Sequence, residues 1–412
     1  MNFKDFSRSV QIRIVLKFMT VITNTAVLPF IVLFFANEIG RIKVTILTIG
    51  IGIVALLGGM LGGRFADLKG RKLTILIGEL MTAFGFILLL LGQLINEYMI
   101  MLSVVAFILT NFFTSMALPA YSALILDETT KENRKSVYIY SMWTSYLGFA
   151  IGSAVGGLLF AEYKILLFTF IIISSLLTVI VIAKWIPETL YKVRNEQIQA
   201  ILEDEQQSIN DTIWTVVWKN KILFLLLFLG FVFSLMDNQI GYYLSLYYYD
   251  LFGEESYELL GFLRTENTVI AVVFLLGVKK LLNKFKELHV ALTGGVFLFI
   301  GYTLLSMLQT QPQLYSAMFL ASVGEILLFP ALQGISANFI PIAFRGRYSS
   351  LANNVGMLGG MFAVTFMLFQ PYPIIITNIY LIIGILTLFV LWILKVKVEK
   401  KNAGKELIIS ES

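Results

Sequence analysis

Long apolar runs separated by short polar segments make up most of the chain. Each run has 18 or more residues, enough to cross a hydrocarbon core of ~30 Å as a helix. We count twelve runs, near 10–37, 43–66, 73–95, 98–126, 135–160, 164–184, 221–249, 258–282, 288–308, 313–339, 347–370 and 373–396. The pattern predicts an all-α membrane protein with twelve transmembrane helices.

Basic residues set the expected orientation of these spans, because Lys and Arg are retained on the cytoplasmic side. With the N-terminus inside, cytoplasmic segments hold 27 of the 31 basic residues. The outer segments hold Arg41, Lys43 and Lys164, and Arg264 falls within a span. We therefore predict a multi-pass protein of the cell membrane with both termini cytoplasmic. The net charge of +5 follows from this orientation and requires no nucleic-acid partner.

The longest polar stretch, roughly 185–220, lies between the sixth and seventh runs and carries mixed charge. We predict that it is a linker between two halves of six spans each. The predicted domains are an N-terminal six-helix bundle (1–186), a cytoplasmic linker (187–219), a C-terminal six-helix bundle (220–398) and a cytoplasmic tail (399–412).

The two halves contain traces of a repeat. A shift of 211 residues places Pro119 on Pro330 and Arg134 on Arg345, at corresponding points of spans four to five and ten to eleven. Duplicated halves with a site at their interface are typical of secondary transporters. We therefore expect the two bundles to be pseudo-symmetric.

Composition excludes several kinds of site. The chain has no Cys and one His, so thiolate metal or redox chemistry and His-based catalysis are not expected. We find no Ser/His/Asp, metal-binding or phosphate-loop constellation. The sequence predicts a protein that is not an enzyme and that holds no metal or cofactor.

A glycine-containing segment, GGRFADLKGRK (62–72), interrupts the apolar pattern between spans two and three. Gly63 and Gly70 allow two helix ends to approach and turn tightly. We expect this segment to join the two spans through a close turn.

Charged side chains in the same segment suggest a latch. Asp67 can accept hydrogen bonds from the N-terminus of a neighbouring helix and from Arg71 or Arg134. Such a network would hold one arrangement of the two halves and break when the cavity changes side. The alternative, that basic residues here only set topology, stays open for Lys69 and Lys72.

A stripe of small residues marks span five, GFAIGSAVGGLLF (148–160). Gly148, Gly152 and Gly156 recur at every fourth position, so they form one groove against which another helix packs closely. Ser153 and Gly157 lie beside this groove. Plain helix packing is physically sufficient to explain the stripe.

Two acids lie near span centres, Asp237 in span seven and Glu325 in span ten. An ionised side chain at mid-bilayer costs ~2.5–3.5 kcal/mol, so each is a functional candidate. Such a group can hold either a proton or a cationic substrate, which is the minimum needed for exchange.

Other polar and aromatic residues of the predicted spans are further candidates for the site. Arg264 and Glu266 lie in span eight, and Arg264 is either a counter-ion for an acid or a residue that reaches outward. In span seven Tyr242 is expected to lie nearly under Asp237 and to offer a ring face to a cation. Glu79 lies nearer the cytoplasmic end of span three, where we expect a structural role. Further candidates to line the cavity are Asn24, Asn111, Trp143, Asn353 and Asn354.

The segment 62–72 resembles the loop signature of the major facilitator superfamily, Gly-x-Leu-Ala-Asp-Arg-x-Gly-Arg-Lys. Span five resembles the glycine motif of antiporters in that superfamily, with Ser153 in place of its Pro. Over its whole length the chain resembles proton-coupled multidrug exporters of the twelve-span type found in Gram-positive bacteria. The signature residues matched in the first segment are Gly63, Ala66, Asp67, Gly70, Arg71 and Lys72.

The resemblance implies the major facilitator fold and a proton-motive force in place of a cofactor. It also implies roles in latching, proton transfer or cation binding for the acids Asp67, Asp127, Asp237 and Glu325. Small lipophilic or cationic substrates, protons and the lipid bilayer are the expected partners, and the chain is expected to be a monomer.

The sequence thus favours a proton-coupled antiporter that exports lipophilic, often cationic drugs by alternating access. A lipid or glycolipid translocase on the same fold is one alternative, and it predicts little dependence on the charge of the cargo. A substrate-specific importer is another, and it predicts more polar residues in the cavity.

Overall fold

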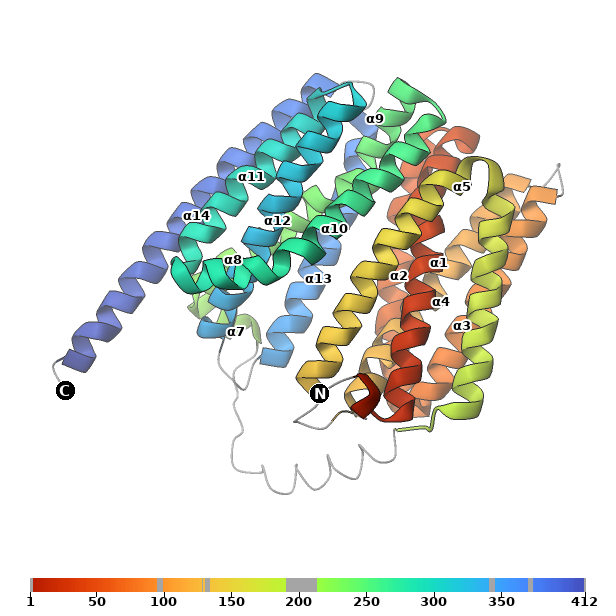
Figure 1. Ribbon diagram of the computed structural model, residues 1–412, viewed down its shortest axis with the longest axis horizontal. Coiled ribbons are helices and arrows are strands. Elements are labelled where there is room, and N and C mark those ends of the chain that lie inside the picture. Colours follow the sequence, from red (N-terminus) through yellow and green to blue (C-terminus); the bar gives the residue numbers. More distant parts are fainter. Residues whose placement is uncertain are drawn as a thin grey trace. The chain divides into compact units, whose positions relative to one another are not determined.

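A computed structural model describes residues 3–94, 99–127, 129, 134–189, 213–340, 345–369 and 373–410. Within these ranges every regular element is a helix (Figure 1). The first part of the chain forms η1 (Phe3–Asp5), α1 (Arg8–Ile39), α2 (Arg41–Lys69), α3 (Arg71–Leu94), α4 (Met99–Asp127) and α5 (Arg134–Trp185). The second part forms α7 (Ile213–Lys219), α8 (Lys221–Asp237), η2 (Asn238–Gly241), α9 (Tyr243–Phe252), α10 (Glu255–Lys284), α11 (Glu287–Met307), α12 (Gln311–Phe339), α13 (Arg345–Val364), η4 (Thr365–Phe369) and α14 (Pro373–Ser410).

Ten helices in the described ranges are long and apolar enough to cross a membrane. One of them contains two predicted spans, because α5 leaves helical geometry at Tyr163 (φ −115°, ψ 29°) between its two arms. A further predicted span, α10, has 30 residues but carries Arg264 and Glu266 and is therefore less apolar. Counting both arms of α5 and including α10 gives the twelve predicted positions.

The chain divides into two units. The N-terminal unit comprises 1–208 together with Tyr257–Thr265, and the C-terminal unit comprises 209–256 and 266–412. The division at 208/209 falls inside the predicted linker, 187–219. The first turns of α10, however, cluster with the N-terminal unit, which the predicted boundary at 220 did not anticipate.

The N-terminal unit is built around contacts of α1 with α5, of α3 with α4 and α5, and of α2 with α4. Apolar side chains from all five helices meet in one core cluster: Leu16, Ala66, Ile75, Ala120, Leu124, Ile182 and Ile186. The start of α1, the turn between α2 and α3 and the end of α5 lie at the same end of this unit.

The C-terminal unit contains a tightly packed row of helices, in which α11 contacts both α12 and α14. Small residues make the α11–α12 approach close. A Cβ built on Gly294 would lie 2.7 Å from the Leu328 nitrogen, and one on Gly301 would meet the Ala321 backbone. Elsewhere in this unit α8 packs against α13.

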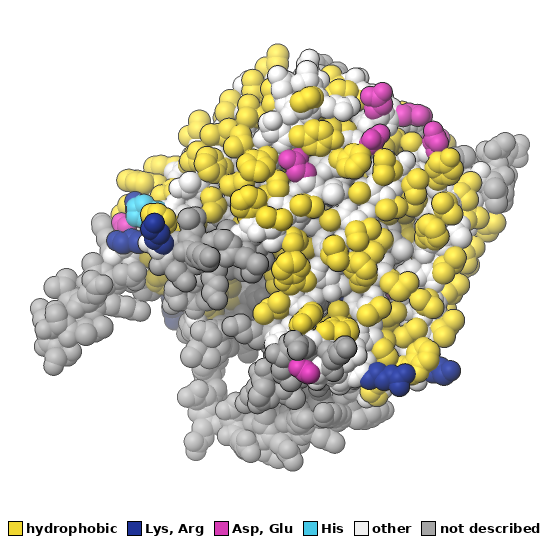
Figure 2. Space-filling model, in the orientation of Figure 1, with side chains coloured by type: hydrophobic (Ala, Val, Ile, Leu, Met, Phe, Trp, Pro, Cys, Tyr) yellow, Lys and Arg dark blue, Asp and Glu magenta, His cyan; other side chains and the backbone are white. Residues whose placement is uncertain are grey.

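Large apolar side chains remain exposed along the helices rather than only at their ends. Hydrophobic side chains spread over the visible face of the molecule in Figure 2. On α5 alone, Leu147, Leu158, Phe170, Ile173 and Ile180 are each more than a third exposed. Such a surface is expected where helices face lipid instead of water.

Candidate functional site

Asp237 lies at a break in the seventh predicted span. The regular helix α8 ends at Asp237, a 3-10 turn follows over Asn238–Gly241, and α9 begins at Tyr243. Asn238 closes α8, because its side-chain amide donates to the Ser234 carbonyl at 2.8 Å. Gln239 is fully buried and donates to the carbonyls of Leu235 (3.1 Å) and Ala363 (3.5 Å), which ties the turn to α13.

The span predicted over 221–249 is present as one apolar stretch, Lys221–Phe252, and this 3-10 turn interrupts its helix. Asp237 and Tyr242 are separated by the 3-10 turn, so the stacking expected for a continuous α-helix does not apply to them. The exposed carboxylate of Asp237 instead lies at the C-terminal end of α8. Since a helix C-terminus carries partial negative charge, the position favours a bound cation or proton beside Asp237.

Glu325 lies on α12 and is held by a side chain from α10. The amide of Asn267 donates to Glu325 Oε2 at 2.8 Å and to the Ser322 hydroxyl at 3.0 Å. The neighbouring apolar side chains Ile270 and Ile326 pack together in one cluster. Asp237 lies near enough for its charge to act on Glu325. The structure therefore brings together the two acids that the sequence singled out.

Asn267 was not among the predicted site residues. Arg264 and Glu266, three residues and one residue before it, were singled out by their charge, whereas Asn267 carries none. Its position three residues after Arg264 on the same helix gave no signal that it faces Glu325.

Glu266 and Arg264 have different surroundings from Asp237 and Glu325. Glu266 Oε2 is buried and accepts no hydrogen bond from the described residues. Arg264 is half-buried and clusters with the N-terminal unit, whereas Glu266 belongs to the C-terminal unit. The counter-ion role of Arg264 stays a prediction.

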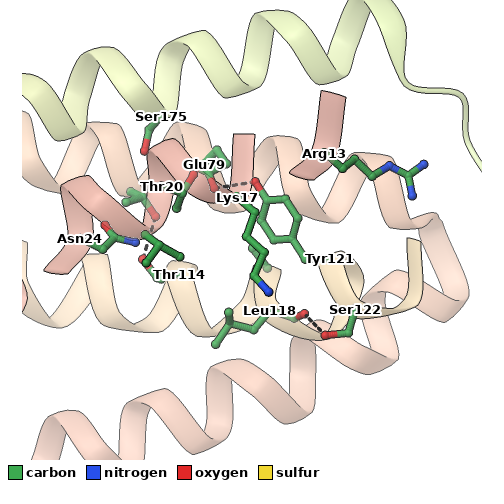
Figure 3. A pocket seen from close by; sticks show the side chains of 13 residues that line it. Arg13, Lys17, Thr20, Asn24, Glu79, Thr114, Leu118, Tyr121, Ser122 and Ser175 are labelled. Atoms are coloured by element: carbon green, nitrogen blue, oxygen red, sulfur yellow. Dashed lines mark hydrogen bonds between the residues drawn. The ribbon is translucent and has the colours of Figure 1, made fainter. Parts of the chain in front are cut away.

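The N-terminal unit contains a cavity of about 330 Å³ between α1, α3, α4 and the second arm of α5 (Figure 3). Glu79 lies in it and is only 6% exposed. The phenol of Tyr121 donates to Glu79 Oε1 at 2.7 Å. Asn24, a predicted lining residue, belongs to this cavity. The sequence assigned Glu79 a structural role near a span end, and the cavity around it was not predicted.

The turn between α2 and α3 shows why its second glycine is required. Gly70 has φ +117° and ψ 146°, which side chains rarely adopt, and a Cβ there would meet the Glu188 carboxylate. Glu188 accepts from the backbone N–H groups of Arg71 and Lys72, both at 3.0 Å. A carboxylate from the segment after α5 thus caps the N-terminus of α3.

Asp67 does not fill this capping position. Its side chain is exposed, and within the described ranges no hydrogen bond or ion pair joins it to another residue. Arg71 is 7% exposed, and Lys72 Nζ donates to the Ala183 carbonyl at 2.8 Å. The side chains of Asp127 and Arg134, the other predicted latch residues, lie outside the described residues.

The glycine stripe of span five faces α1. Added Cβ atoms on Gly148, Gly152 and Gly156 would run into Val21, the Ile22 carbonyl and the Ala26 carbonyl of α1 respectively.

The next glycine of span five faces the start of α10. Gly157 approaches Gly261 so closely that a Cβ on Gly157 would lie 2.8 Å from the Gly261 Cα. Between the two contacts, Ser153 is 1% exposed, and its hydroxyl bonds to no described residue.

Two other predicted lining residues of the N-terminal unit, Asn111 and Trp143, do not line the Glu79 cavity. Asn111 donates to the Phe107 carbonyl of its own helix at 2.8 Å. Trp143 is 43% exposed.

Comparison with known families decides the class of the protein. The model of the Major Facilitator Superfamily matches residues 14–364. The chain belongs to this superfamily. Members are transporters rather than enzymes, which confirms the resemblance, the fold class and the prediction of no enzymatic activity. The twelve helical positions of this chain are accordingly those of an integral membrane transporter of the superfamily.

Curated relatives of this superfamily member are transporters of ions and drugs. The chain is 24% identical over 390 residues to the Na(+), Li(+), K(+)/H(+) antiporter of Planococcus maritimus, covering 88% of this chain and 89% of the relative. It is 25% identical over 356 residues to multidrug resistance protein 2 of Bacillus subtilis, covering 84% of each.

Solved structures of the superfamily share the fold. A D-xylose–proton symporter superposes with a TM-score of 0.73 at 15% identity, covering 94% of this chain and 96% of the other. The nucleoside transporter NupG superposes with a TM-score of 0.69 at 12% identity, covering 95% and 99%. At these identities the likeness establishes the architecture alone.

Proposed function

We propose that this chain is a proton-coupled antiporter that exports lipophilic, often cationic compounds across the cell membrane, with both termini in the cytoplasm. The proposal is supported by the position of Glu325 within reach of the charge of Asp237 inside the C-terminal unit. One acid is positioned by Asn267 and the other lies at the negative end of α8.

Competition between protons and cargo gives the mechanism. Both amide hydrogens of Asn267 are donated, one of them to Glu325 Oε2. The other carboxylate oxygen of Glu325 is then the place for a proton, or for the positive end of a cargo molecule. A proton arriving from outside neutralises the pair and displaces the cargo, and loss of that proton inside regenerates the negative charge.

The driving force is adequate for this cycle. When the cargo is neutral, each exchanged proton moves one elementary charge, and through 100 mV this yields about 2.3 kcal/mol. At about 1.4 kcal/mol per tenfold ratio, this supports a concentration ratio of roughly 50. When the cargo is a monovalent cation, one-for-one exchange moves no net charge and the pH gradient alone drives it.

Two relatives favour different cargo classes for the same exchange. The name of the Bacillus relative supports export of drugs, and that of the Planococcus relative supports exchange of alkali cations for protons. The acid pair suits a positively charged cargo of either size. A lipid or glycolipid translocase, or a specific importer that is not coupled to protons, would not require two ionisable acids in one unit.

Transport into everted membrane vesicles tests the proposal. Vesicles containing wild type, Glu325→Gln, Asp237→Asn or the control Asp250→Asn are energised with a pH gradient, acid inside, and supplied with a fluorescent lipophilic cation. Asp250 is exposed on α9, so its variant makes the same chemical change away from the pair.

We expect gradient-dependent dye uptake by wild type and Asp250→Asn, and at least tenfold slower uptake by the two pair variants. Uptake that persists in both pair variants, or that ignores the gradient in wild type, would overturn proton coupling at these acids. Lipid translocation, tested as flipping of a labelled phospholipid, would then become the leading hypothesis.

A further inference from the structure

An apolar groove of about 310 Å³ lies between α11 and α14 of the C-terminal unit, and the proposed mechanism makes no use of it. The two helices run antiparallel, because Ser306 contacts Thr377 at 2.9 Å near one end and His289 contacts Lys395 at 3.0 Å near the other. Both helices are long and apolar enough to cross a membrane. The groove therefore follows the length of two membrane spans.

The floor of the groove is closed and its walls are apolar. A Cβ built on Gly384 would lie 3.1 Å from the Phe299 Cβ, so the two helices are in close contact there. Exposed apolar side chains of both helices form the walls: Val296 and Ile300 on α11, and Leu381 and Ile385 on α14. Because the bilayer core offers no water, a hydrocarbon chain is what fills a groove of this kind.

Two basic side chains lie at the end of the groove where α11 begins. Lys395 Nζ lies 3.0 Å from His289 Nε2, and His289, the cyan side chain of Figure 2, is exposed beside other basic side chains. With the ammonium group as the donor, the imidazole is neutral and carries its proton on Nδ1. The remaining N–H groups of both side chains are donors as well. The pair is therefore completed by an acceptor, and an anionic phosphate oxygen makes the stronger, charge-assisted hydrogen bond.

Acidic side chains in the described part of the chain do not supply this acceptor. Glu287 is two residues before His289, on the opposite side of α11, and a Cβ built on Gly334 of α12 would lie 2.7 Å from its Oε1. Glu399 is one turn beyond Lys395 on α14, and no hydrogen bond or ion pair joins these two described residues. An anion from outside the chain is therefore the acceptor that fits the pair.

Nearby side chains are those expected at the level of the lipid headgroups. Trp392, one turn before Lys395, is 54% exposed and stacks on Phe389 with ring centroids 6.0 Å apart. Trp is enriched where the hydrocarbon core meets the headgroups. Lys286, three residues before His289, is also exposed and adds positive charge. Basic side chains at this level attract anionic lipids.

The dimensions of the site fit a single lipid of one leaflet. Leu304, at the far end of the groove, is fifteen residues after His289 on α11, a distance of about 22 Å at ~1.5 Å per residue. Half of a bilayer, including its headgroup region, is about 20–22 Å thick. The distance from the basic pair to the end of the groove thus matches the depth of one leaflet.

We propose that α11 and α14 bind one anionic phospholipid, whose phosphate is held by His289 and Lys395 and whose acyl chain lies in the groove. A zwitterionic headgroup also has a phosphate, but its ammonium group is repelled by the basic pair, which gives the selectivity. The proposed orientation, with both termini in the cytoplasm, places the site in the cytoplasmic leaflet, where anionic lipids give a negative surface potential. This lipid is a ligand rather than cargo, so its binding does not depend on the proposed drug export.

Lipid titration of the purified, delipidated full-length protein in detergent tests this site, and native mass spectrometry counts the lipids bound. The first ligand is dioleoylphosphatidylglycerol, which is anionic. Dioleoylphosphatidylcholine has the same chains and a zwitterionic headgroup. Glycerol phosphate has the phosphate group and no acyl chains.

Four variants separate the basic pair from the groove. Lys395→Gln and His289→Ala each remove one member of the pair, and Ile385→Ala removes part of one wall. Lys184→Gln is the control: Lys184 is exposed at the end of α5, in the other unit, with its Nζ 5.1 Å from the centroid of the Trp185 ring. The control thus makes the same chemical change at another Lys beside a Trp.

We expect wild type to bind one phosphatidylglycerol at least tenfold more tightly than phosphatidylcholine, and glycerol phosphate at least a hundredfold more weakly. Lys395→Gln should weaken phosphatidylglycerol binding about fivefold, the contribution of one Lys near an anionic lipid, and leave phosphatidylcholine binding within twofold. His289→Ala should weaken phosphatidylglycerol binding several-fold, and Lys184→Gln should leave it within twofold. Ile385→Ala should weaken the binding of both phospholipids alike, because it changes only the groove.

Equal affinities of wild type for the two phospholipids, or equal losses in Lys395→Gln and Lys184→Gln, would overturn the site. Glycerol phosphate bound as tightly as phosphatidylglycerol would show a site for free phosphate groups instead of a lipid. Thermal unfolding checks that each variant is folded, and if Lys395→Gln is not, unchanged binding by His289→Ala overturns the proposal. Dye uptake by the vesicles remains a separate test, so either proposal can fail while the other stands.

Discussion

Gly63 lies inside α2 and Gly70 lies at the turn between α2 and α3. The two look alike in the sequence, yet the structure predicts opposite effects for their substitution by Ala. Gly70 has φ +117° and ψ 146°, a region reserved for glycine, so an Ala there costs about 1–3 kcal/mol of backbone strain. Its methyl group would also displace the Glu188 carboxylate from the N–H groups of Arg71 and Lys72. Loss of such a cap costs about 0.5–2 kcal/mol.

We therefore expect Gly70→Ala to lower the free energy of unfolding by about 3 kcal/mol, the middle of the summed range. Gly63 lies inside α2, and its nearest neighbour would be the Pro119 Cβ at 3.7 Å, an ordinary contact. Gly63→Ala should be neutral or stabilising by up to about 1 kcal/mol, because Ala has the higher helix propensity.

A double-mutant cycle separates the two costs of Gly70→Ala. In a Glu188→Ala background the cap is already absent, so only the backbone strain remains. The double variant should then be more stable than additivity predicts by about 1 kcal/mol.

Unfolding by sodium dodecyl sulfate in mixed micelles, followed by circular dichroism, measures these differences. Equal costs at Gly63 and Gly70 would refute the assignment of strain to Gly70. Strict additivity in the cycle would refute the contact between Gly70 and Glu188.

Two further predictions concern matched pairs of residues. Asn267→Ala should slow gradient-dependent dye uptake at least tenfold, because Glu325 loses its hydrogen-bond donor. Asn111→Ala should leave uptake within twofold, because the Asn111 amide donates to a carbonyl of its own helix. Comparable effects of the two substitutions would contradict the role of Asn267 in positioning Glu325. Gly156→Ala should destabilise the protein by about 1–3 kcal/mol, because the added methyl group meets the α1 backbone. A methyl group on Gly230 would have nothing within 4 Å, so Gly230→Ala should stabilise the protein by up to about 1 kcal/mol. Thermal unfolding of the purified variants in one detergent measures this difference, and equal shifts would argue against close packing of α5 on α1.

Much of the fold could be predicted from the sequence because the bilayer imposes a strong and local signal. The length of each apolar run predicts a span. The same logic marked Asp237 and Glu325, since a charge inside an apolar run is costly wherever the run packs. The spacing of Gly148, Gly152 and Gly156 indicated a packing face, and the structure seats that face on α1.

What the sequence did not indicate depends on contacts between distant segments. The capping of α3 by Glu188 joins positions 117 residues apart, and Asp67, nearer in sequence, was the more obvious choice. The local sequence does not distinguish Asn267 from other amides. Its role depends on α12, which places Glu325 Oε2 2.8 Å from the Asn267 amide nitrogen. The break after Asp237 lies in a stretch with no Pro, where Gln239 bonds to α13. The hydropathy pattern does not indicate which distant residues form these hydrogen bonds.

Proton release on cargo binding tests the central claim most directly. Purified wild-type protein in weakly buffered detergent solution at pH 7 receives tetraphenylphosphonium, and a pH-sensitive dye reports the protons released. The account predicts release that saturates with cargo and disappears in Glu325→Gln and in Asp237→Asn, while Asp250→Asn releases protons as wild type does. Binding of the cation by wild type with no release of protons would contradict competition between proton and cargo at the acid pair.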